Sequence, residues 1–373
     1  MVLDMRALTS RERLTRLFSG QEIDRVPIWL LNPVHPLSCY TDVWRNPHYA
    51  PIRELMETAC DHFDRRWCDH GFCYNANPEI VQGPRPGEVD GEPCTIRFVR
   101  YRDFELTAYT VRTRRGLRVK YLVDDPAQLL EILKIPYVAP LPDVRAYERE
   151  KAELGSRGLM MFDLGDALGA LYSIMSAQDF SMATATDYDI VLEFLDEMHR
   201  RVHALYRYML ERSVGEVFFI VGAEFAGPPI VSPARFHEMS ARYVKELVDL
   251  IRSYGRWSIV HYHGQLRDVL DGMRHASPDG LHTIEAPPIG NCTITQARQA
   301  LGDTILIGNI QYDDLARLPE EQIAEMTRSA VEEGKAGRFI LSPTAGPYEE
   351  TPGEQLLRNY RTFVETGLRY GGL

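Results

Sequence analysis

The regular alternation of short apolar runs with longer amphipathic segments constrains the fold of this chain more than any other feature. Between residues 159 and 342, six apolar runs have the length of buried strands, and helical patterns fill most of the gaps. Strands that alternate with helices predict a parallel sheet in an α/β protein. The predicted strands are 159–163, 216–221, 257–261, 281–285, 304–308 and 338–342, and the predicted helices are 187–212, 232–254, 265–275, 293–301 and 319–335.

Two runs nearer the N-terminus extend the pattern. A capping box that begins at Thr9 predicts a first helix at 11–18, and the segment Asp24–Leu31, a polar turn that leads into an apolar strand, follows it. A helical segment at 49–63 then leads to a weaker strand at 63–68. Eight strands, each followed by a helix, predict a (β/α)8 TIM barrel whose active site lies at the carboxyl ends of the strands.

The pattern changes between residues 79 and 123. This stretch has alternating or β-branched runs joined by short polar turns, which predicts an antiparallel meander of about three strands. We therefore expect one barrel domain over residues 1–373, with a β insertion at about 79–123.

Composition excludes several partners. The formal net charge of −11 argues against a nucleic-acid partner, because phosphate binding needs clustered Lys and Arg. No apolar run approaches the roughly 18 residues of a membrane span. The N-terminus lacks the apolar core of a signal peptide, so we expect a cytoplasmic protein. The six cysteines are sparse for 373 residues, and we expect thiols rather than a disulfide framework.

Two histidines lie at the end of one predicted strand, in the segment Trp257–Gly264. Successive strand residues point to opposite faces, so His261 and His263 share a face and lie about 6–7 Å apart along the chain. Two neutral imidazoles at this spacing can bind one metal ion, and the alternative is a pair that only makes hydrogen bonds. Tyr262, between them, is a candidate substrate contact.

A carboxylate closes the next predicted strand. Glu285 precedes two prolines, and it would lie at the same end of the sheet as His261 and His263. Two histidines and a carboxylate are an accepted ligand set for catalytic zinc or another divalent ion, with one position left for water or substrate. The sequence therefore predicts a metal site formed by these three residues.

Other strand ends also carry polar residues. Asp163 and Glu224 are candidates for a general acid or base, although Glu224 also suits the turn before the next helix. Asn309 and Gln311 are predicted to donate hydrogen bonds to substrate oxygens, unless Gln311 only begins the following helix.

Several segments, in order along nearly the whole chain, carry a resemblance to a known family. They are Thr9–Leu14 with Asp24–Ile28, Val260–Leu270, Ile284–Pro288, Gly308–Gln311, and Phe339–Pro343 with Thr351–Pro352 and Asn359–Tyr360. Together these segments resemble the uroporphyrinogen decarboxylase superfamily. The resemblance implies a (β/α)8 barrel and often a homodimer.

The superfamily contains two chemistries. In true decarboxylases, arginines after the Asp-Arg-Val-Pro segment hold the carboxylates of the porphyrinogen, but the corresponding run Leu30–Cys39 has no Arg. Tyr172 resembles the site tyrosine of the decarboxylases and is therefore a candidate catalytic residue. The missing cations argue against a tetrapyrrole substrate.

The other branch contains methyltransferases that act on corrinoid proteins and bind zinc through a His-x-Cys pair, a later Cys and, in some, a Glu. His261 matches the histidine, His263 stands in place of the first Cys, and Glu285 matches the Glu, whereas Ser342–Gly346 lacks the later Cys. A His, His, Glu set makes the ion more electrophilic than thiolate ligands do, which suits polarising an oxygen or nitrogen.

The sequence thus predicts a metal-assisted methyltransferase that moves a methyl group from a small O- or N-methylated substrate to cobalamin on a separate corrinoid protein. The ion would be divalent, and zinc is the ion that the resemblance implies. Two alternatives stay open at this point: a lyase that acts on a carboxylated substrate, and a non-catalytic barrel that binds a small ligand or a corrinoid protein.

Overall fold

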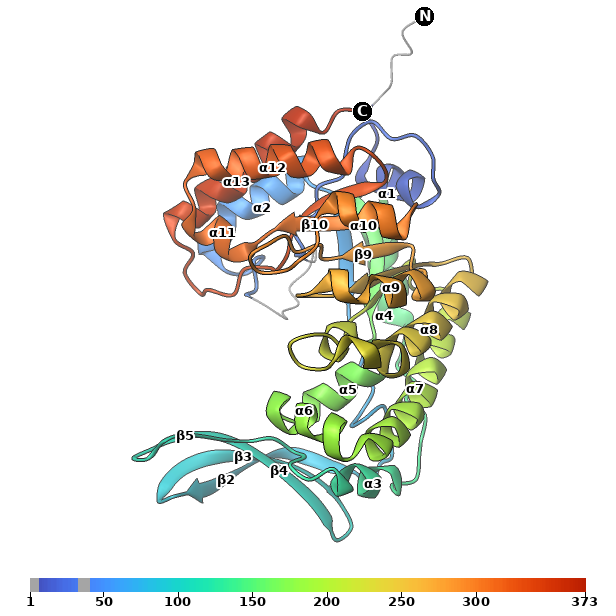
Figure 1. The fold of residues 1–373 in the computed structure, drawn as a ribbon, viewed down its shortest axis with the longest axis vertical. Helices are drawn as coiled ribbons and strands as arrows, with labels where there is room; N and C mark the ends of the chain where they lie inside the picture. Colours follow the sequence, from blue (N-terminus) through green and yellow to red (C-terminus); the bar gives the residue numbers. More distant parts are fainter. Residues whose placement is uncertain (1–6, 33–40) are drawn as a thin grey trace, which may run out of the picture.

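A computed structural model describes residues 7–32 and 41–373, and a seven-stranded parallel sheet forms its centre (Figure 1). The strands pair in chain order, as expected when each returns through a helix on the same side. The six predicted later strands and the predicted strand near residue 63 are confirmed. They are β1 (His62–Arg66), β6 (Gly158–Asp163), β7 (Val217–Ile220), β8 (Trp257–His261), β9 (Gly280–His282), β10 (Ile305–Ile310) and β11 (Phe339–Pro343).

The other early run, predicted as a strand at Asp24–Leu31, connects the two edges of this sheet without forming a regular strand. Leu341 of β11 donates its N–H to the carbonyl of Pro27 over 2.9 Å, and Asp61, before β1, donates its N–H to the carbonyl of Ile28 over 2.6 Å. Pro27 has no N–H, and the N–H of Ile28 goes to the Asp61 carboxylate. A regular ladder is therefore interrupted at this place.

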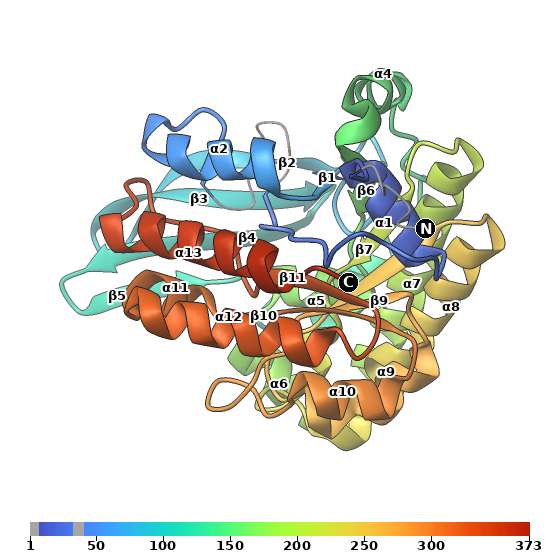
Figure 2. The same ribbon diagram turned by 90° about the horizontal axis from the view of Figure 1, so that it is seen from above.

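Helices surround the outside of the sheet (Figure 2). The predicted helix at 232–254 is broken, because a short turn (Pro233–Arg235) and a π-helical turn (His237–Ala241) precede α8. No helix among the described residues is long and apolar enough to cross a membrane. The helices are α1 (Ser10–Phe18), α2 (Ala50–Ala59), α3 (Ala127–Leu133), α4 (Arg145–Leu154), α5 (Ala167–Ile174), α6 (Ala177–Thr186), α7 (Tyr188–Glu211), α8 (Arg242–Ser253), α9 (Leu270–Ala276), α10 (Ile294–Leu301), α11 (Tyr312–Arg317), α12 (Glu320–Gly334) and α13 (Glu354–Tyr370).

The two faces of the sheet pack into two separate apolar cores. The larger core lies between the strands and the helices, and the smaller one lies on the inner face, where α1 packs against the amino ends of the strands. Along β8, Ile259 belongs to the inner core and Val260 to the outer one, as the two-residue repeat of a strand requires. His261 therefore shares the inner face with Ile259, at the carboxyl end.

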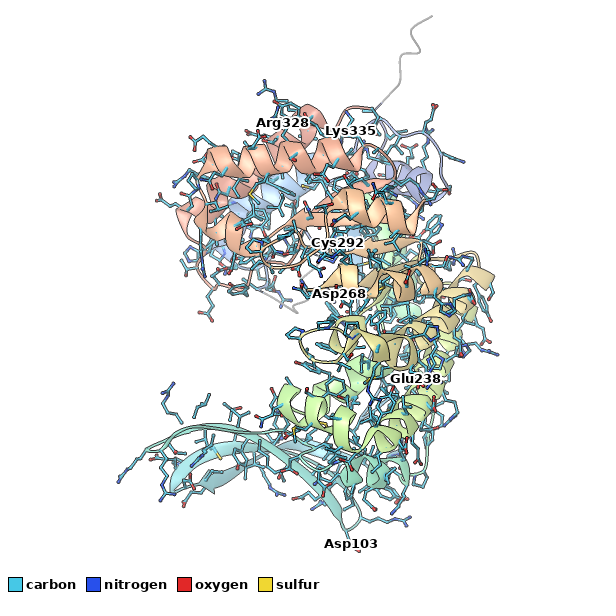
Figure 3. All side chains as sticks on the ribbon, in the orientation of Figure 1. Asp103, Glu238, Asp268, Cys292, Arg328 and Lys335 are labelled. Carbon is cyan, nitrogen blue, oxygen red and sulfur yellow. The ribbon has the colours of Figure 1, made fainter. Side chains whose placement is uncertain are left out.

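The insertion forms a separate antiparallel sheet with the order β2-β3-β4-β5. The prediction of about three strands missed β2, which contains Pro84 and Pro86. Proline is accepted there because β2 is an edge strand, where an N–H need not pair. The β3–β4 turn at Asp103 lies at the opposite end of the molecule from α12, which carries Arg328 (Figure 3). The strands are β2 (Val81–Val89), β3 (Glu92–Tyr101), β4 (Phe104–Thr113) and β5 (Gly116–Lys120).

A buried carboxylate holds the N-terminal segment to the sheet. Asp61 accepts hydrogen bonds from Nη1 of Arg13 over 2.6 Å, Nη1 of Arg25 over 2.8 Å and the N–H of Ile28 over 3.0 Å. Arg13 also pairs with Asp24. These contacts connect α1 to the segment around Ile28 and to Asp61, the residue that precedes β1.

Replacing Asp61 by Asn should lower the free energy of unfolding by about 3 kcal/mol, because two arginines lose a buried counter-charge. Chemical denaturation measures this loss. The control is Glu105→Gln, which removes one partner of the exposed Arg85–Glu105 pair and should leave stability unchanged within error. Equal effects of the two substitutions would contradict the role assigned to Asp61.

Candidate active site at the carboxyl edge of the parallel sheet

Two buried histidines from neighbouring strands form a hydrogen-bonded pair. The Nδ1 atoms of His261 and His282, the last residues of β8 and β9, lie 2.8 Å apart. Nε2 of His282 lies 3.1 Å from the carbonyl oxygen of Pro343 and must donate to it, because a carbonyl only accepts. Burial, together with the nearby positive charges of His263 and Arg65, lowers the pKa of His282 to about 3, so its Nδ1 accepts. Nδ1 of His261 therefore donates, and Nε2 of His261 keeps a lone pair.

Glu285 holds the second predicted ligand, His263. Oε1 of Glu285 lies 2.9 Å from Nδ1 of His263 and accepts from Nε2 of Gln311 over 3.0 Å, while Oε2 accepts from the N–H of Gly264 over 2.6 Å. The Thr344 hydroxyl donates to the Gln311 amide oxygen over 2.9 Å and orients that amide. Burial alone would lower the pKa of His263, but the hydrogen bond and charge of Glu285 outweigh it and raise that pKa. For Glu285, the same contact outweighs burial and lowers the pKa.

The donor chemistry of the two histidines fits a divalent metal ion. Within the described residues, neither His261 nor His263 has a hydrogen-bond partner at Nε2, whereas a neighbour engages each Nδ1. Metal-binding histidines typically use this arrangement. The two ring centres lie 4.5 Å apart. Across residues 7–32 and 41–373, no three His, Cys, Asp or Glu side chains gather as one ligand group, so Glu285 as a third ligand stays a prediction.

A buried ion pair lies beside the histidines. Arg65 of β1 donates through Nη2 to Oδ2 of Asp163, and Nε1 of Trp67 donates to the same oxygen over 3.1 Å. The guanidinium carbon of Arg65 lies 4.8 Å from the ring centres of both Trp67 and Phe219. Asp163, predicted as an acid or base, is thus an ion-paired carboxylate at the end of β6.

Two further carboxyl groups lie next to this edge, with Asp166 buried and Glu224 half-buried. Oε2 of Glu224 accepts from the N–H of Gly222 over 3.1 Å, and Oδ1 of Asp166 caps α5 by accepting from the N–H of Gly169 over 2.6 Å. Burial raises the pKa of Glu224 to about 7 against the opposing positive charge of His263. Burial, with the charge of Glu224, raises the pKa of Asp166 to about 8. Near neutral pH, Glu224 can therefore hold a proton and release it.

The remaining predicted site residues lie outside this hydrogen-bonded group. Tyr262 is only 1% exposed and packs edge-on against Phe236, because alternation along the strand points it away from the two histidines. Tyr172 stacks on Phe225 with ring centres 3.7 Å apart. Asn309 lines a cavity of about 440 Å³ beside α12. Their predicted roles at the site stay predictions.

Sequence reasoning missed His282 and Arg65. The signal for His282 was present, because a polar residue two positions after Gly280 shares the inner face of a predicted strand. Arg65 lies in a segment predicted only as a weak strand, so its face was not assigned. Most of the run Leu30–Cys39, whose lack of Arg argued against a tetrapyrrole, lies outside the described residues.

The family follows from the sequence comparison. A family model described as Uroporphyrinogen decarboxylase (URO-D) matches residues 151–366, which include β6 to β11 with His261, His263 and His282. The chain belongs to the uroporphyrinogen decarboxylase family. A comparison with curated proteins found no match.

The comparison with solved structures supports the fold through the first of the following three matches. A methyltransferase from Methanosarcina mazei is 17% identical over 97% of this chain and 99% of its own, with a TM-score of 0.63. D-Psicose 3-epimerase from Clostridium cellulolyticum H10 is 12% identical over 61% of this chain and 93% of its own, with a TM-score of 0.33. The IolI protein with a bound zinc atom is 13% identical over 61% of this chain and 95% of its own, with a TM-score of 0.37. The last two are too dissimilar to inform the function of this family member.

The raised pKa of Asp166 predicts how stability depends on pH. Because the folded protein keeps this proton to about pH 8 and the unfolded chain loses it near pH 4, unfolding releases a proton within that window. The free energy of unfolding should therefore fall as pH rises from 6 to 8, by at most about 1.4 kcal/mol per pH unit for one group. Asp166→Asn keeps the capping oxygen and should flatten this fall in denaturation experiments.

The matched control is Asp143→Asn. Asp143 is a surface aspartate, and its pairing with Arg145 lowers the pKa of the Asp143 carboxyl to about 2. Loss of the Asp143 carboxylate should leave the pH dependence of the free energy of unfolding between pH 6 and 8 unchanged. A wild-type slope in Asp166→Asn would show that Asp166 is already ionised at neutral pH.

Proposed function

We propose that this protein is a metal-assisted methyltransferase that moves a methyl group from a small O- or N-methylated substrate to a corrinoid on a partner protein. The observation that carries the proposal is the pair His261 and His263, each engaged through Nδ1 and each free of protein hydrogen bonds at Nε2 among the described residues. Membership of the family, and a fold shared with a methyltransferase, support it.

In this proposal, His261 and His263 hold a divalent ion, and zinc is the ion that the family resemblance suggests. When bound, such an ion polarises the oxygen or nitrogen that carries the methyl group. His282 keeps His261 in the tautomer that leaves Nε2 free, and Glu285 does the same for His263. We assign Glu285 to this orienting role because its oxygens already accept from His263, Gly264 and Gln311.

Glu224 supplies the proton. As the bond between the methyl carbon and the heteroatom breaks, the heteroatom keeps the electron pair and the methyl group passes to the acceptor. The heteroatom then takes the proton that Glu224 holds near neutral pH. Asp163 is less suited to this role because Arg65 and Trp67 engage its Oδ2.

We also infer that the segment around Ile28 closes the sheet into the predicted (β/α)8 barrel. Its hydrogen bonds to Leu341 on one side and Asp61 on the other support this closure. A single domain over residues 1–373, a homodimer and a cytoplasmic location belong to the same proposal.

The two alternatives have less support. A lyase for a carboxylated substrate needs a cation at the site, and Arg65 is paired with Asp163. A non-catalytic barrel gives no reason for the half-buried carboxyl group of Glu224 and the buried one of Asp166, whose raised pKa values are typical of catalytic sites.

Elemental analysis of the purified protein tests the metal. We expect about one equivalent of zinc or another divalent ion in the wild type, and none in a His261→Ala, His263→Ala double variant. The single variant His263→Ala should lose metal and methyl transfer while its thermal stability stays nearly unchanged. A wild type that binds no added divalent ion in calorimetry would overturn the proposal.

Glu285→Gln separates orientation from ligation. Gln keeps an oxygen that accepts from Nδ1 of His263, so an orienting role predicts a metal affinity that is lowered by about 10–100-fold but still measurable. Affinity as low as that of His263→Ala would instead identify Glu285 as a ligand.

A further inference from the structure

A cavity of about 470 Å³ lies at the carboxyl end of β6, beside Asp163, and is not used by the mechanism above. Its walls come from the loop after β1, from the antiparallel sheet and from α5. Trp67, Phe72 and Phe225 are among its lining residues, with Val99 and Ala170. This volume is within the range of about 300–1,000 Å³ that is typical of small-molecule sites.

The cavity adjoins the strand ends at the carboxyl edge of the parallel sheet. Asp163, the last residue of β6, and Val221, which follows β7, form its wall on the side of the parallel sheet. Phe225, the residue after Glu224, is part of the same wall, and its ring stacks on Tyr172. The wall of the cavity thus adjoins the segment that carries Glu224.

The loop after β1 is held firmly in place. The Tyr74 hydroxyl donates to the carbonyl of Leu164 over 2.6 Å, and Arg201 donates to the carbonyl of Cys73 over 3.2 Å. Gly165 has φ +67°, and a Cβ at that position would lie 2.6 Å from the Tyr74 hydroxyl oxygen. The aromatic wall is thus built into the fold before a ligand binds.

The charges around the cavity compensate each other. The carboxylate of Asp163 pairs with Arg65, whose guanidinium also covers one face of Trp67. His70 stacks on Tyr74, and burial lowers its pKa, so it is neutral near pH 7. A cationic ligand would be repelled by the Arg65 guanidinium, which already covers one face of Trp67. An anionic ligand would be repelled by the Asp163 carboxylate. Either charge would lose its hydration without a free partner.

We propose that this cavity binds the substrate, and that the substrate is a neutral aromatic methyl ether. Stacking of its ring among Trp67, Phe72 and Phe225 provides the affinity. The assignment of the ligand as substrate rests on the proposed methyl transfer, whereas the binding preference rests on the cavity alone. The proposal selects neutral aromatic methyl ethers among the O- and N-methylated compounds considered above.

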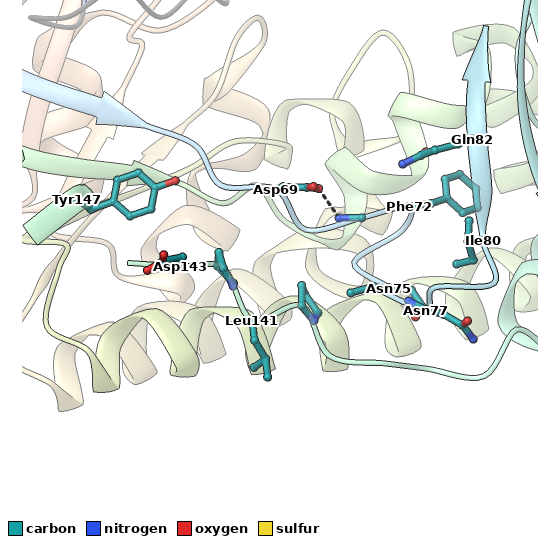
Figure 4. Close-up of a pocket in the computed structure, with 13 residues that line it drawn as sticks. Asp69, Phe72, Asn75, Asn77, Ile80, Gln82, Leu141, Asp143 and Tyr147 are labelled. Atoms are coloured by element: carbon teal, nitrogen blue, oxygen red, sulfur yellow. Dashed lines mark hydrogen bonds between the residues drawn. The ribbon is translucent and has the colours of Figure 1, made fainter. Parts of the chain in front are cut away.

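The neighbouring cavity in Figure 4 suits this ligand less well. It has a volume of about 500 Å³ and shares Phe72 and Gln82 with the first cavity. Its described lining contains the carboxylates of Asp69 and Asp143 but not Asp163, so it does not reach the end of β6.

Calorimetry with three ligands that share one ring and differ in charge tests the proposal. The ligands are 3,4-dimethoxytoluene, 3,4-dimethoxybenzoate and 3,4-dimethoxybenzylamine, measured at pH 7 with the full-length protein. We expect the neutral ligand to bind about tenfold or more tightly than either charged one. Ala170→Leu, which fills the cavity from α5, should abolish this binding, and Ala177→Leu, an exposed alanine outside the cavity, should not change it.

The outcomes separate the cavity from the reaction. Equal or tighter binding of a charged ligand, unchanged binding in a folded Ala170→Leu variant, or no binding of the neutral ligand would overturn the cavity assignment. Circular dichroism and thermal denaturation show whether the variant is folded. Selective binding without methyl transfer to free cob(I)alamin would keep the cavity assignment and count against the proposed reaction. Methyl transfer without selective binding would support the proposed reaction and count against the cavity assignment.

Discussion

Burial of both faces of the parallel sheet is the constraint on which the rest of this structure depends. Each strand contributes alternate side chains to two apolar cores, one beneath the helices and one on the inner face. Polar groups are costly in either core unless they are hydrogen-bonded, so they gather where the strands end. The carboxyl edge is therefore the place where His261, His282 and Asp163 lie.

At this edge, the buried side chains of His282, Glu285 and Asp163 each have a defined polar partner. His282 is fixed by the carbonyl of Pro343, and that bond in turn decides which nitrogen of His261 carries the proton. Glu285 does the same for His263. The order of these contacts matters for function, because it leaves one nitrogen of each of the two site histidines available.

The elements that the sequence predicted less well are those in which a side chain or a proline replaces a regular backbone contact. The segment around Pro27 connects β11 to β1, but a missing N–H and the carboxylate of Asp61 interrupt its ladder. β2 was missed because Pro84 and Pro86 are unusual in a strand, although an edge position accepts them. In both places, local preference was read correctly, but the neighbouring chain decided the outcome.

The sequence by itself determined the alternating order of strands and helices, the insertion, and the two histidines on one face, since these depend on periodicity along the chain. The resemblance of its motifs pointed to the family. Only the tertiary structure decided that His282 and Arg65 lie at the site and that Glu285 contacts His263. It also showed that an aromatic cavity adjoins Asp163. Those contacts join residues far apart in the chain, and the packing of neighbouring strands and loops fixes them, which no local pattern encodes.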